Sequence, residues 1–496
     1  MNENNSPDFD NSYVSLPERF YTRLAPTEVS NPELIRINHS LAEKLGINAS
    51  WLESDQGLQT FAGNFIPGGS EPIATVYAGH QFGNWNPQLG DGRAILLGEV
   101  LSSEGQRFDL QLKGSGPTPY SRGGDGRAPL GPVLREYIVS EAMAALDIPT
   151  SRALACVTTG ENVYRGLPLP GAIITRVAQS HIRIGHFQYF ASRRDIEGLR
   201  LLADHVIQRH YPDLKKSDNP YKDLYKVVIE KQASLVAQWQ LIGFIHGVMN
   251  TDNMLLSGET IDYGPCAFMD IFDPDAVFSS IDQRGRYAYG NQSDMAHWNL
   301  MCLGQSLFLL FDENENQALE IAQETLNQFP EYYSKAYQQG MNKKLGLDKN
   351  IHGDAGKVLG EELLQLMSVH ELDFTLTFRR LAELVQKEND QESISSLIEF
   401  PEALQPWLEK WQVELDKNNV DRSLLQSKMF STNPAYIPRN HMVEEAINKA
   451  IDQNDFSAFN QLVDLLKDPF TLDPEKLSYA KTPEPDQVVI ATFCGT

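Results

Sequence analysis

The chain has 496 residues, with 42 lysines and arginines against 66 aspartates and glutamates, so its formal net charge is −24. An acidic surface opposes a phosphate backbone at long range, which excludes a nucleic-acid-binding protein and disfavours anionic lipid as a partner. Apolar residues make up 41% and charged residues 22% of the chain, which is typical of a globular protein with a large core. At about 150 residues per domain, the length predicts about three units or one two-lobed enzyme with appendages.

No segment approaches the run of about 18 apolar residues that a membrane-spanning helix needs. The acidic start, residues 1–10, has no apolar run behind it, so we expect no secretory signal and predict a cytoplasmic protein. The four cysteines are widely scattered and form no CxxC motif, which indicates reduced thiols rather than a zinc site or a disulfide framework: Cys156, Cys266, Cys302 and Cys494.

The first half of the chain reads as a sheet with working loops. Residues 1–75 are expected to form an N-terminal extension with a helix over 32–45 that Asn31 caps. Strand-like runs at 94–100 and 108–112 then alternate with dense glycine up to Arg127. Pro132 opens a predicted helix over 133–146, and further strands follow at 153–158 and 172–177.

Beyond Gly185 the pattern becomes mainly helical. Amphipathic helices are predicted over 221–245, 295–311, 318–328, 360–366 and 441–451. Sheet first and helices after predict an α+β fold. Its expected parts are the N-terminal extension, a β-rich N-lobe over 76–178, a mainly helical C-lobe over 179–440, and a C-terminal helix and extended tail over 441–496.

Residues 244–265 carry the clearest chemical signal. They predict a helix that ends near residue 246, a polar loop to Asn253, a short hairpin and then Asp262-Tyr-Gly, which is the layout of a protein-kinase catalytic loop and metal-binding motif. Mg²⁺ prefers oxygen ligands, so the amide of Asn253 and the carboxylate of Asp262 suit it, and Asp252 is then a candidate base. Alternatively, these polar residues only cap turns.

Upstream residues complete a nucleotide site. Lys113 ends a strand, and Glu136 on the following helix is its expected partner, although such a pair is often merely solvated. The glycine turn 88–98 can approach phosphate closely but is not the kinase glycine-rich motif. Arg176 and Arg183 suit phosphate oxygens bidentately, or alternatively pair with the many acids of the chain.

Several long stretches together resemble the selenoprotein-O family of protein adenylyltransferases. They are Tyr77-Ala-Gly-His-Gln-Phe-Gly83, Gln88-Leu-Gly-Asp-Gly-Arg93, residues 110–122, Gly124-Asp-Gly-Arg127, residues 246–253 and Asp262-Tyr-Gly-Pro265. The resemblance covers most of the chain and implies a kinase-like, two-lobed enzyme. It also implies transfer of AMP from ATP to Ser, Thr or Tyr hydroxyls of substrate proteins with release of pyrophosphate, and dependence on Mg²⁺ or Mn²⁺. In the family the nucleotide is held flipped relative to a kinase.

The resemblance assigns roles to individual residues. Asp252 is the implied proton acceptor, Asn253 and Asp262 are the implied metal ligands, and Glu136 orients the catalytic Lys113. ATP would be bound by Gly90, Gly92, Arg93, Lys113, Asp125, Gly126, Arg176, Arg183 and Asp262. In the flipped pose, Lys113, Arg176 and Arg183 would neutralise the outer phosphates and help pyrophosphate leave.

Val248 distinguishes the chain from an ordinary kinase. A kinase loop has its catalytic Asp two residues after the His, and valine can neither orient a hydroxyl nor accept a proton. One alternative is a kinase-like phosphotransferase, which Val248 disfavours. Another is a non-catalytic ATP-binding pseudokinase scaffold, which has no need of the metal-ligand pair.

Two cysteines suggest redox control. Cys266 follows the Asp262-Tyr-Gly-Pro motif, and Cys494 lies on the tail, where eukaryotic relatives in the family carry selenocysteine. A reversible disulfide between them would pin the tail beside the active site. Alternatively, they are two unrelated thiols. The identity of the substrate proteins, the preferred metal, the oligomeric state and the physiological trigger are not encoded in any motif of the chain.

Overall fold

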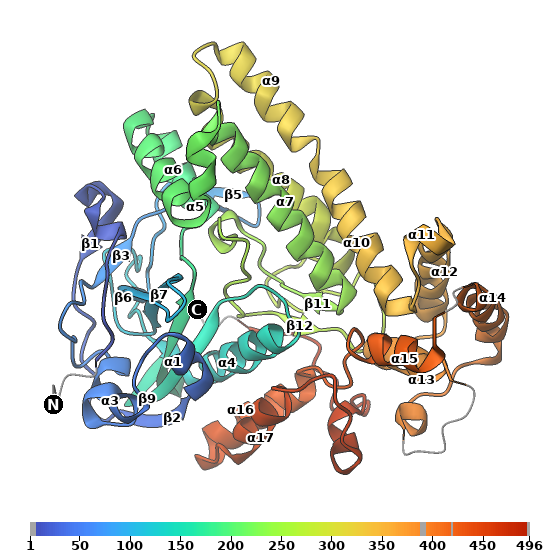
Figure 1. The fold of residues 1–496 in the computed structure, drawn as a ribbon. Helices are drawn as coiled ribbons and strands as arrows, with labels where there is room; N and C mark the ends of the chain where they lie inside the picture. The colour runs from blue at the N-terminus through green and yellow to red at the C-terminus, as the bar shows by residue number, and fades with distance from the viewer. Residues whose placement is uncertain (1–5, 387–392, 418–419, 494–496) are drawn as a thin grey trace.

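The computed structural model describes residues 6–386, 393–417 and 420–493. The N-terminal part is built on an antiparallel sheet, and the part that follows is helical (Figure 1). The predicted mixed fold, with strands first and helices after, is therefore confirmed.

The sheet is eight-stranded and wholly antiparallel, with the order β1-β3-β6-β7-β10-β9-β2 and with β8 paired to β10. Its strands are β1 (Tyr21–Arg23), β2 (Glu33–Ile37), β3 (Ile73–Thr75), β6 (Ala94–Leu101), β7 (Arg107–Lys113), β8 (Ala128–Pro129), β9 (Arg152–Arg165) and β10 (Leu167–Ala178). Three of these strands come from residues 1–75. The region expected as an extension thus contributes to the sheet, while the proposed domain limits stay a prediction.

Helices cover both faces of the sheet, because successive side chains of a strand point to opposite faces. On β10, Ile173 packs with α1 (His39–Lys44), α2 (Ala49–Leu52) and α3 (Asp55–Phe61). The next residue, Ile174, faces α4 (Leu130–Ala145), which in turn packs against α16 (Asn440–Gln453) and α17 (Ser457–Leu465) (Figure 1). The C-terminal helices are therefore joined to the sheet through α4.

The remaining helices form two further apolar cores. One core contains α5 to α9 and the other is built on α10 and α12 to α15. The bounds of these helices are α5 (Ile184–Ser192), α6 (Ile196–His210), α7 (Pro220–Leu241), α8 (Gln292–Leu307), α9 (Glu315–Leu326), α10 (Phe329–Leu345), α11 (Lys349–His352), α12 (Ala355–Val369), α13 (Phe374–Glu383), α14 (Gln405–Asp416) and α15 (Arg422–Phe430).

The helix expected over 32–45 is wrong in its first half. Residues 33–37 form the strand β2, since their β-branched isoleucines pair well against β9, and Asn31 caps no helix there. The helix α1 begins only at His39, where the side chain of Asn38 accepts a hydrogen bond from the amide of Leu41 at 3.2 Å. Asn38 is therefore the N-cap.

The hairpin expected over 254–261 is also wrong, because each arm bonds to a different partner. Leu256 donates its amide to Ile182 at 2.9 Å, and Thr260 donates to Pro149 at 2.9 Å. The preceding helix α7 ends at Leu241, and a left-handed Gly243 leads into the short strand β11 (Phe244–Ile245), which pairs with β12 (Ala267–Phe268). Tertiary pairing thus replaces the local hairpin.

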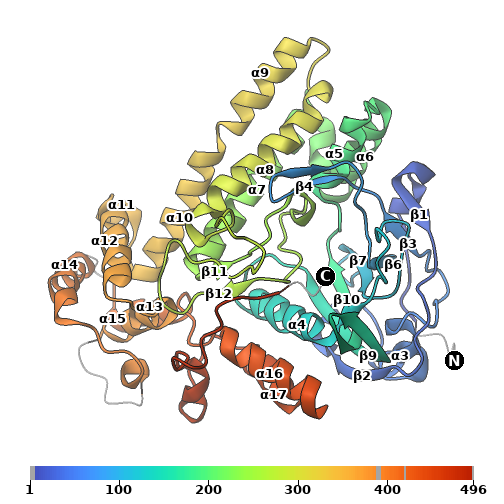
Figure 2. The ribbon, with the colours of Figure 1, turned by 180° about the vertical axis from the view of Figure 1, so that it is seen from behind.

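A separate hairpin leaves the main sheet. Its strands β4 (Gly79–Gln81) and β5 (Asn84–Asn86) pair only with each other and lie near α5 and α8, away from β6 and β7 (Figures 1 and 2). The segment comes from the predicted N-lobe but packs against α5 and the loop that follows β11.

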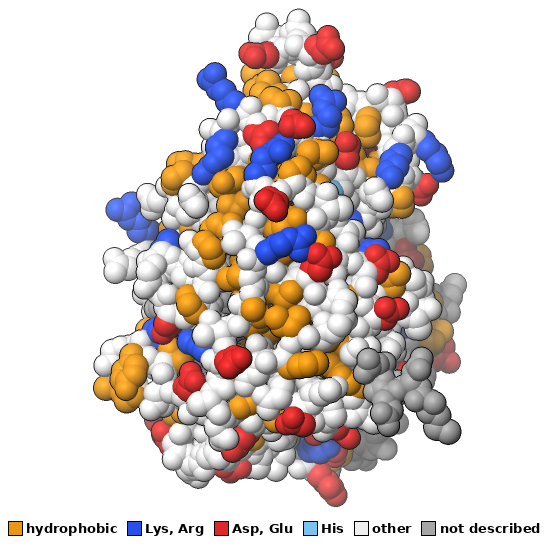
Figure 3. Space-filling model, turned by 90° about the vertical axis from the view of Figure 1, so that its left-hand side faces the viewer, with side chains coloured by type: hydrophobic (Ala, Val, Ile, Leu, Met, Phe, Trp, Pro, Cys, Tyr) orange, Lys and Arg blue, Asp and Glu red, His pale blue; other side chains and the backbone are white. Residues whose placement is uncertain are grey.

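One face of the molecule shows how charges are distributed on it. On the face drawn in Figure 3, acidic and basic side chains alternate among small apolar patches, and no broad basic stripe crosses the residues shown in colour. No helix within the described residues has the length and apolar character needed to cross a membrane. The tail is non-helical over its described residues 483–493, as expected, and the cytoplasmic location stays a prediction.

Candidate active site

A cavity of about 640 Å³ lies between the glycine turns of the sheet and the loop after β11. It is lined by eleven of the twelve residues that the sequence indicated, namely Gly90, Gly92, Arg93, Lys113, Asp125, Gly126, Arg176, Arg183, Asp252, Asn253 and Asp262. The remaining residue, Glu136, lies behind Lys113 on α4. The structure therefore brings the predicted set together at one place.

The centre of the cavity wall is a cluster of four charges, three of them buried and the fourth, Asp262, partly exposed. Lys113 on β7 lies with its Nζ 2.7 Å from Glu136 Oε2 and 3.0 Å from Asp262 Oδ1. Arg176 on β10 contacts the same two acids, through Nε to Glu136 and through Nη2 to Asp262 Oδ1 at 3.0 Å. Two cations and two carboxylates thus neutralise one another below the cavity.

The cluster keeps both acids ionised. Burial acts to raise the pKa of Glu136, but Arg176 and Lys113 outweigh it and lower that pKa. Burial also opposes ionisation of Asp262, yet the charges of Lys113 and Arg176 hold its pKa well below the usual value. Sequence reasoning predicted the Lys113–Glu136 pair. It left open whether Arg176 contacts phosphates or acids, and here Arg176 contacts acids.

The loop after β11 carries the metal-site candidates. Asn253 donates its Nδ2 to the carbonyl of Val248 at 3.1 Å and to Asp262 Oδ2 at 3.4 Å, which turns its Oδ1 the other way. Asp262 has a left-handed backbone with φ of 68°, a strained geometry typical of functional sites. Its Oδ1 is held by Lys113 and Arg176, so Oδ2 is the oxygen that faces Asn253.

The donor set suits a hard divalent cation. One amide oxygen and one carboxylate oxygen lie at the cavity, and Mg²⁺ usually takes only one or two protein oxygens and completes its shell with phosphates and waters. Within the described residues, no three His, Cys, Asp or Glu side chains converge on one point. Asn253 and Asp262 thus match the one or two protein oxygens that such a cation takes.

Asp252 is the second acid at the cavity. Its Oδ2 accepts a hydrogen bond from Gln81 Nε2 at 3.0 Å, and its carbonyl accepts one from Arg183 Nη1 at 2.8 Å. Burial raises the pKa of Asp252 to about 6, although Arg183 and Gln81 act in the opposite direction. The carboxyl is therefore poised to exchange a proton near neutral pH.

The guanidinium of Arg183 is held among polar and aromatic groups at the cavity wall. Its guanidinium lies 4.9 Å from the ring centre of Tyr77 and 3.7 Å from Asp91 Oδ1. Its buried Nε has no hydrogen-bond partner among the described residues. A buried guanidinium with a free donor fits an anionic ligand.

The glycines at the cavity allow two loops to touch. A side chain at Gly90 would lie 2.4 Å from the Tyr120 ring, and one at Gly126 would lie 2.1 Å from the backbone of Gly116. Both glycines also have positive φ, of 133° and 65°. Only glycine fits these positions, and the open backbone is left free to approach a phosphate.

Asp125 is held by a residue that sequence reasoning missed. Arg165, near the tip of the β9–β10 hairpin, binds both carboxylate oxygens of Asp125 at 2.8 Å and also lines the cavity. Gln81 and Tyr77 were missed in the same way, since they lay inside a quoted motif without a role. No spacing in the sequence connects any of them to the site.

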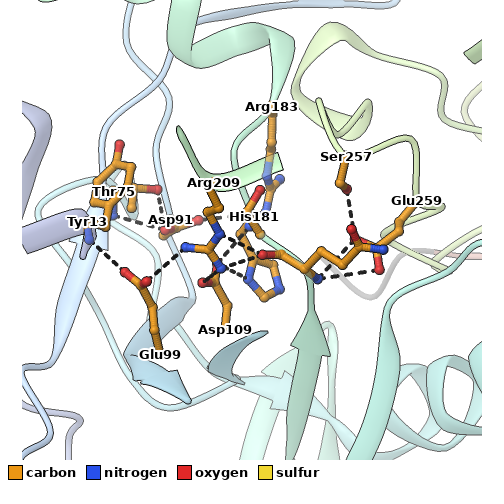
Figure 4. A network of polar contacts seen from close by, with 12 residues as sticks. Tyr13, Thr75, Asp91, Glu99, Asp109, His181, Arg183, Arg209, Ser257 and Glu259 are labelled. Carbon is orange, nitrogen blue, oxygen red and sulfur yellow. Dashed lines mark hydrogen bonds and ion pairs between the residues drawn. The ribbon is translucent and has the colours of Figure 1, made fainter. Parts of the chain in front are cut away.

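A polar network supports the site from behind (Figure 4). Asp91 accepts hydrogen bonds from the amide and hydroxyl of Thr75 at 2.9 and 2.6 Å, which fixes the glycine turn. Further along, Glu99 accepts the amide of Tyr13 at 2.6 Å, and Arg209 lies 3.1 Å from the same carboxylate. The N-terminal segment is therefore tied to β6 and α6.

Cys266 is buried beside this site. Its predicted partner, Cys494, lies outside the described residues. Nearby, Thr492 on the tail donates its hydroxyl to the carbonyl of Pro265 at 2.7 Å and its amide to Phe278 at 2.7 Å. The described end of the tail thus lies against the segment that follows Asp262.

Comparisons with known proteins identify the family of the chain. The model of the family described as "Protein adenylyltransferase SelO" matches residues 4–467. The chain belongs to this family. Proteins named "Protein nucleotidyltransferase YdiU" are 53% identical in Bradyrhizobium sp. (strain ORS 278), over 98% of this chain and 99% of the relative, and 54% identical in Rhizobium meliloti (strain 1021), over the same shares. As a SelO-family member, the chain is a protein nucleotidyltransferase, and ATP is its nucleotide substrate.

A substitution at Glu136 tests the role of the charge cluster in catalysis. We expect Glu136→Gln to lower kcat/KM for ATP about 10- to 100-fold, because the residues that orient functional groups contribute on that scale and because Lys113 and Arg176 lose a shared anion. AMP transfer measured against ATP concentration gives the value. Glu141→Gln is the matched control. Glu141 lies on the same helix, its carboxylate is 2.6 Å from Arg152, and neither residue lines the cavity. Equal losses in the two variants would assign the effect to α4 rather than to the cluster.

Glu259 gives a test of stability against pH. This buried carboxyl accepts hydrogen bonds from Ser257 and the amide of Gln179 (Figure 4), and burial raises its pKa to about 7. Because the folded-state pKa lies above the unfolded value of about 4.5, the folded state is destabilised as pH rises from 4.5 to 7, by about 3 kcal/mol in total.

We therefore expect Glu259→Gln to raise the melting temperature relative to the unsubstituted protein at pH 8, with a much smaller gain at pH 5. Thermal unfolding in matched buffers measures both. A gain that is the same at the two pH values would mean that Glu259 ionises normally in the folded protein.

Proposed function

We propose that the cavity binds ATP with its α-phosphate toward the acceptor, and that the enzyme moves AMP onto Ser, Thr or Tyr hydroxyls of substrate proteins. The observation that carries the proposal is the pairing of an intact nucleotide site with Val248. This valine lines the cavity five residues before Asn253. At the position where a kinase has its catalytic Asp, this chain has a side chain that can neither orient a hydroxyl nor accept a proton.

The kinase-like, two-lobed arrangement is part of this proposal. Its support is the order of the parts along the chain: a strand-borne Lys113, a helix-borne Glu136, then a loop with Asn253 and a following Asp262, all at one cavity. The sheet and the helices on either side of that cavity would be the two lobes.

The cations of the cavity have separate proposed tasks. Arg183 and Arg93 both line the cavity and would contact phosphate oxygens directly. Lys113 and Arg176 already pair with Glu136 and Asp262, so they would neutralise the phosphates from a fixed position. The glycine turns 90–92 and 124–126 would supply backbone N–H groups for the remaining oxygens.

Asn253 and Asp262 would hold Mg²⁺ or Mn²⁺. The cation would supply positive charge at the phosphates as the bond to pyrophosphate breaks. The preorganisation belongs to the chain, since Asn253 Nδ2 is tied to Val248 and Asp262 Oδ1 to Lys113. These hydrogen bonds leave Asn253 Oδ1 for the cation, while Asp262 Oδ2 would exchange its 3.4 Å contact with Asn253 Nδ2 for the cation.

Asp252 would accept the proton of the acceptor hydroxyl. The acceptor oxygen forms a bond to the α-phosphorus, the bond from that phosphorus to the bridging oxygen of the β-phosphate breaks, and pyrophosphate leaves with the electron pair. The role of Asp252 as proton acceptor is supported by its position and burial, because Asp252 lines the cavity next to Asn253 and has a raised pKa.

The position of the transferred label tests this reaction. The protein, a generic acceptor protein and Mg²⁺ or Mn²⁺ are incubated with ATP labelled at the α-phosphate or at the γ-phosphate. We expect label from the α-position alone, with loss of signal in Asp262→Ala, since that variant lacks a metal ligand and an anion of the charge cluster. Asp275→Ala, at an exposed position, is the matched control and should keep the activity.

The other outcomes choose between the alternatives. Label from the γ-position alone would replace the proposal with a phosphotransferase. ATP binding without label from either position would favour the pseudokinase scaffold.

Redox control through Cys266 and Cys494 stays part of the proposal. Its support is the contact of Thr492 with Pro265, which brings the tail to the residue before Cys266. We expect peptide mass mapping of the oxidised protein to yield a Cys266–Cys494 cross-linked peptide that reductant removes. Thiol alkylation of both cysteines under oxidising conditions would refute the pairing.

A further inference from the structure

Three consecutive residues of the β4–β5 hairpin, 80–82, donate hydrogen bonds to residues 250–252 of the candidate catalytic loop. The amide of His80 donates to Thr251 Oγ1 at 2.7 Å, and the amide of Phe82 donates to Asn250 Oδ1 at 3.0 Å. Between them, the Gln81 side chain donates to Asp252 Oδ2 at 3.0 Å. A segment 171 residues distant in sequence thus fixes three adjacent loop residues.

The backbone of the hairpin allows a close approach to the loop. A Cβ at Gly79 would lie 3.1 Å from Thr251 Oγ1 and 3.2 Å from Asp252 Oδ1, so glycine permits the close approach. Phe82 has a φ of 50°, a left-handed conformation that an aromatic residue adopts only when its surroundings hold it. Here its ring packs against Tyr287, with ring centres 5.1 Å apart.

The two carboxylate oxygens of Asp252 differ in their hydrogen bonds. Oδ2 is held by Gln81, whereas Oδ1 is buried without a hydrogen-bond partner among the described residues. The backbone of Asp252 is fixed separately, since Arg183 donates to its carbonyl. Gln81 itself lines the cavity and is only partly buried. Gln81 therefore links the carboxylate of Asp252 to the wall of the cavity.

We propose that Gln81 is a positioning residue for the transfer reaction: its amide fixes the rotamer of Asp252, and with it the place of the carboxylate at the cavity wall. The inference rests on the proposed function, in which Asp252 takes the acceptor proton as the acceptor oxygen bonds to the α-phosphorus and pyrophosphate leaves. A carboxylate on a short side chain rotates freely unless a second group holds it, and a misplacement of about 1 Å can cost about 100-fold in rate.

The test compares Gln81→Met with Gln188→Met. Methionine keeps the volume of glutamine and removes the amide donor. Gln188 on α5 is the matched control, because its Nε2 lies 2.9 Å from His80 Nδ1 and so supports the same hairpin without touching Asp252. AMP transfer gives kcat, and calorimetric titration of ATP with Mg²⁺ gives the nucleotide affinity.

We expect Gln81→Met to lower kcat about 10- to 100-fold while the Kd for ATP changes less than about twofold, a factor worth only about 0.4 kcal/mol. Gln188→Met should keep kcat within about threefold, the change expected from loosened packing alone. Gln81→Asn, whose shorter amide cannot reach Asp252, should behave as Gln81→Met, and this second variant guards against a methionine-specific packing defect.

Three results would overturn the role of Gln81: an unchanged kcat in Gln81→Met, an equal loss in Gln188→Met, or a parallel loss of ATP affinity. Transfer of the γ-phosphate by the unsubstituted protein would refute the proposed function alone, since an acceptor hydroxyl loses its proton in either reaction and the same variants still decide the role of Gln81. An unsubstituted protein that binds ATP and transfers nothing would overturn both.

Discussion

The largely buried ion cluster of Lys113, Glu136, Arg176 and Asp262 is the constraint on which the site depends. Four charges at this depth are tolerated only because each cation contacts both acids, since an unpaired buried charge costs several kcal/mol. The four residues come from β7, α4, β10 and the loop after β11. Their mutual pairing therefore fixes the sheet, the helix below it and the loop in one arrangement.

This cluster also explains why the cavity is ready for a nucleotide. Lys113 and Arg176 hold Asp262 Oδ1, which sets the orientation of the carboxylate and leaves Oδ2 beside Asn253. Hydrogen bonds that fix a side chain in advance reduce the ordering cost of binding. The same pairing keeps Asp262 ionised despite burial. Charge state and geometry thus have one physical cause.

The sequence predicted those parts of the site that local pattern encodes. Lys113 follows an alternating strand, Glu136 lies on an apolar-periodic helix, and Asn253 and Asp262 have a recognisable spacing, so all four were found. The pairing of Arg176 with Glu136 was left open, because a choice between phosphate and carboxylate depends on distances across strands. Gln81 and Arg165 were missed for the same reason, since their partners lie 171 and 40 residues away along the chain.

The errors in secondary structure have a related origin. The local sequence pattern predicted a helix for residues 33–37 and a hairpin for residues 254–261. In both, a distant segment offers better backbone partners: β9 pairs with the first, and Ile182 and Pro149 accept from the second. Tertiary hydrogen bonds overrode local preference at one edge of the sheet and in the segment that follows the loop carrying Asp252.

The β4–β5 hairpin extends this logic to the other side of the cavity. The ion cluster holds Asp262 from below, whereas the hairpin holds residues 250–252 from the side, and Asn253 lies between the two supports. A loop without regular secondary structure would otherwise sample many side-chain orientations. Because both supports consist of contacts between segments far apart in sequence, the geometry of the site depends on the whole fold rather than on the loop that bears its residues.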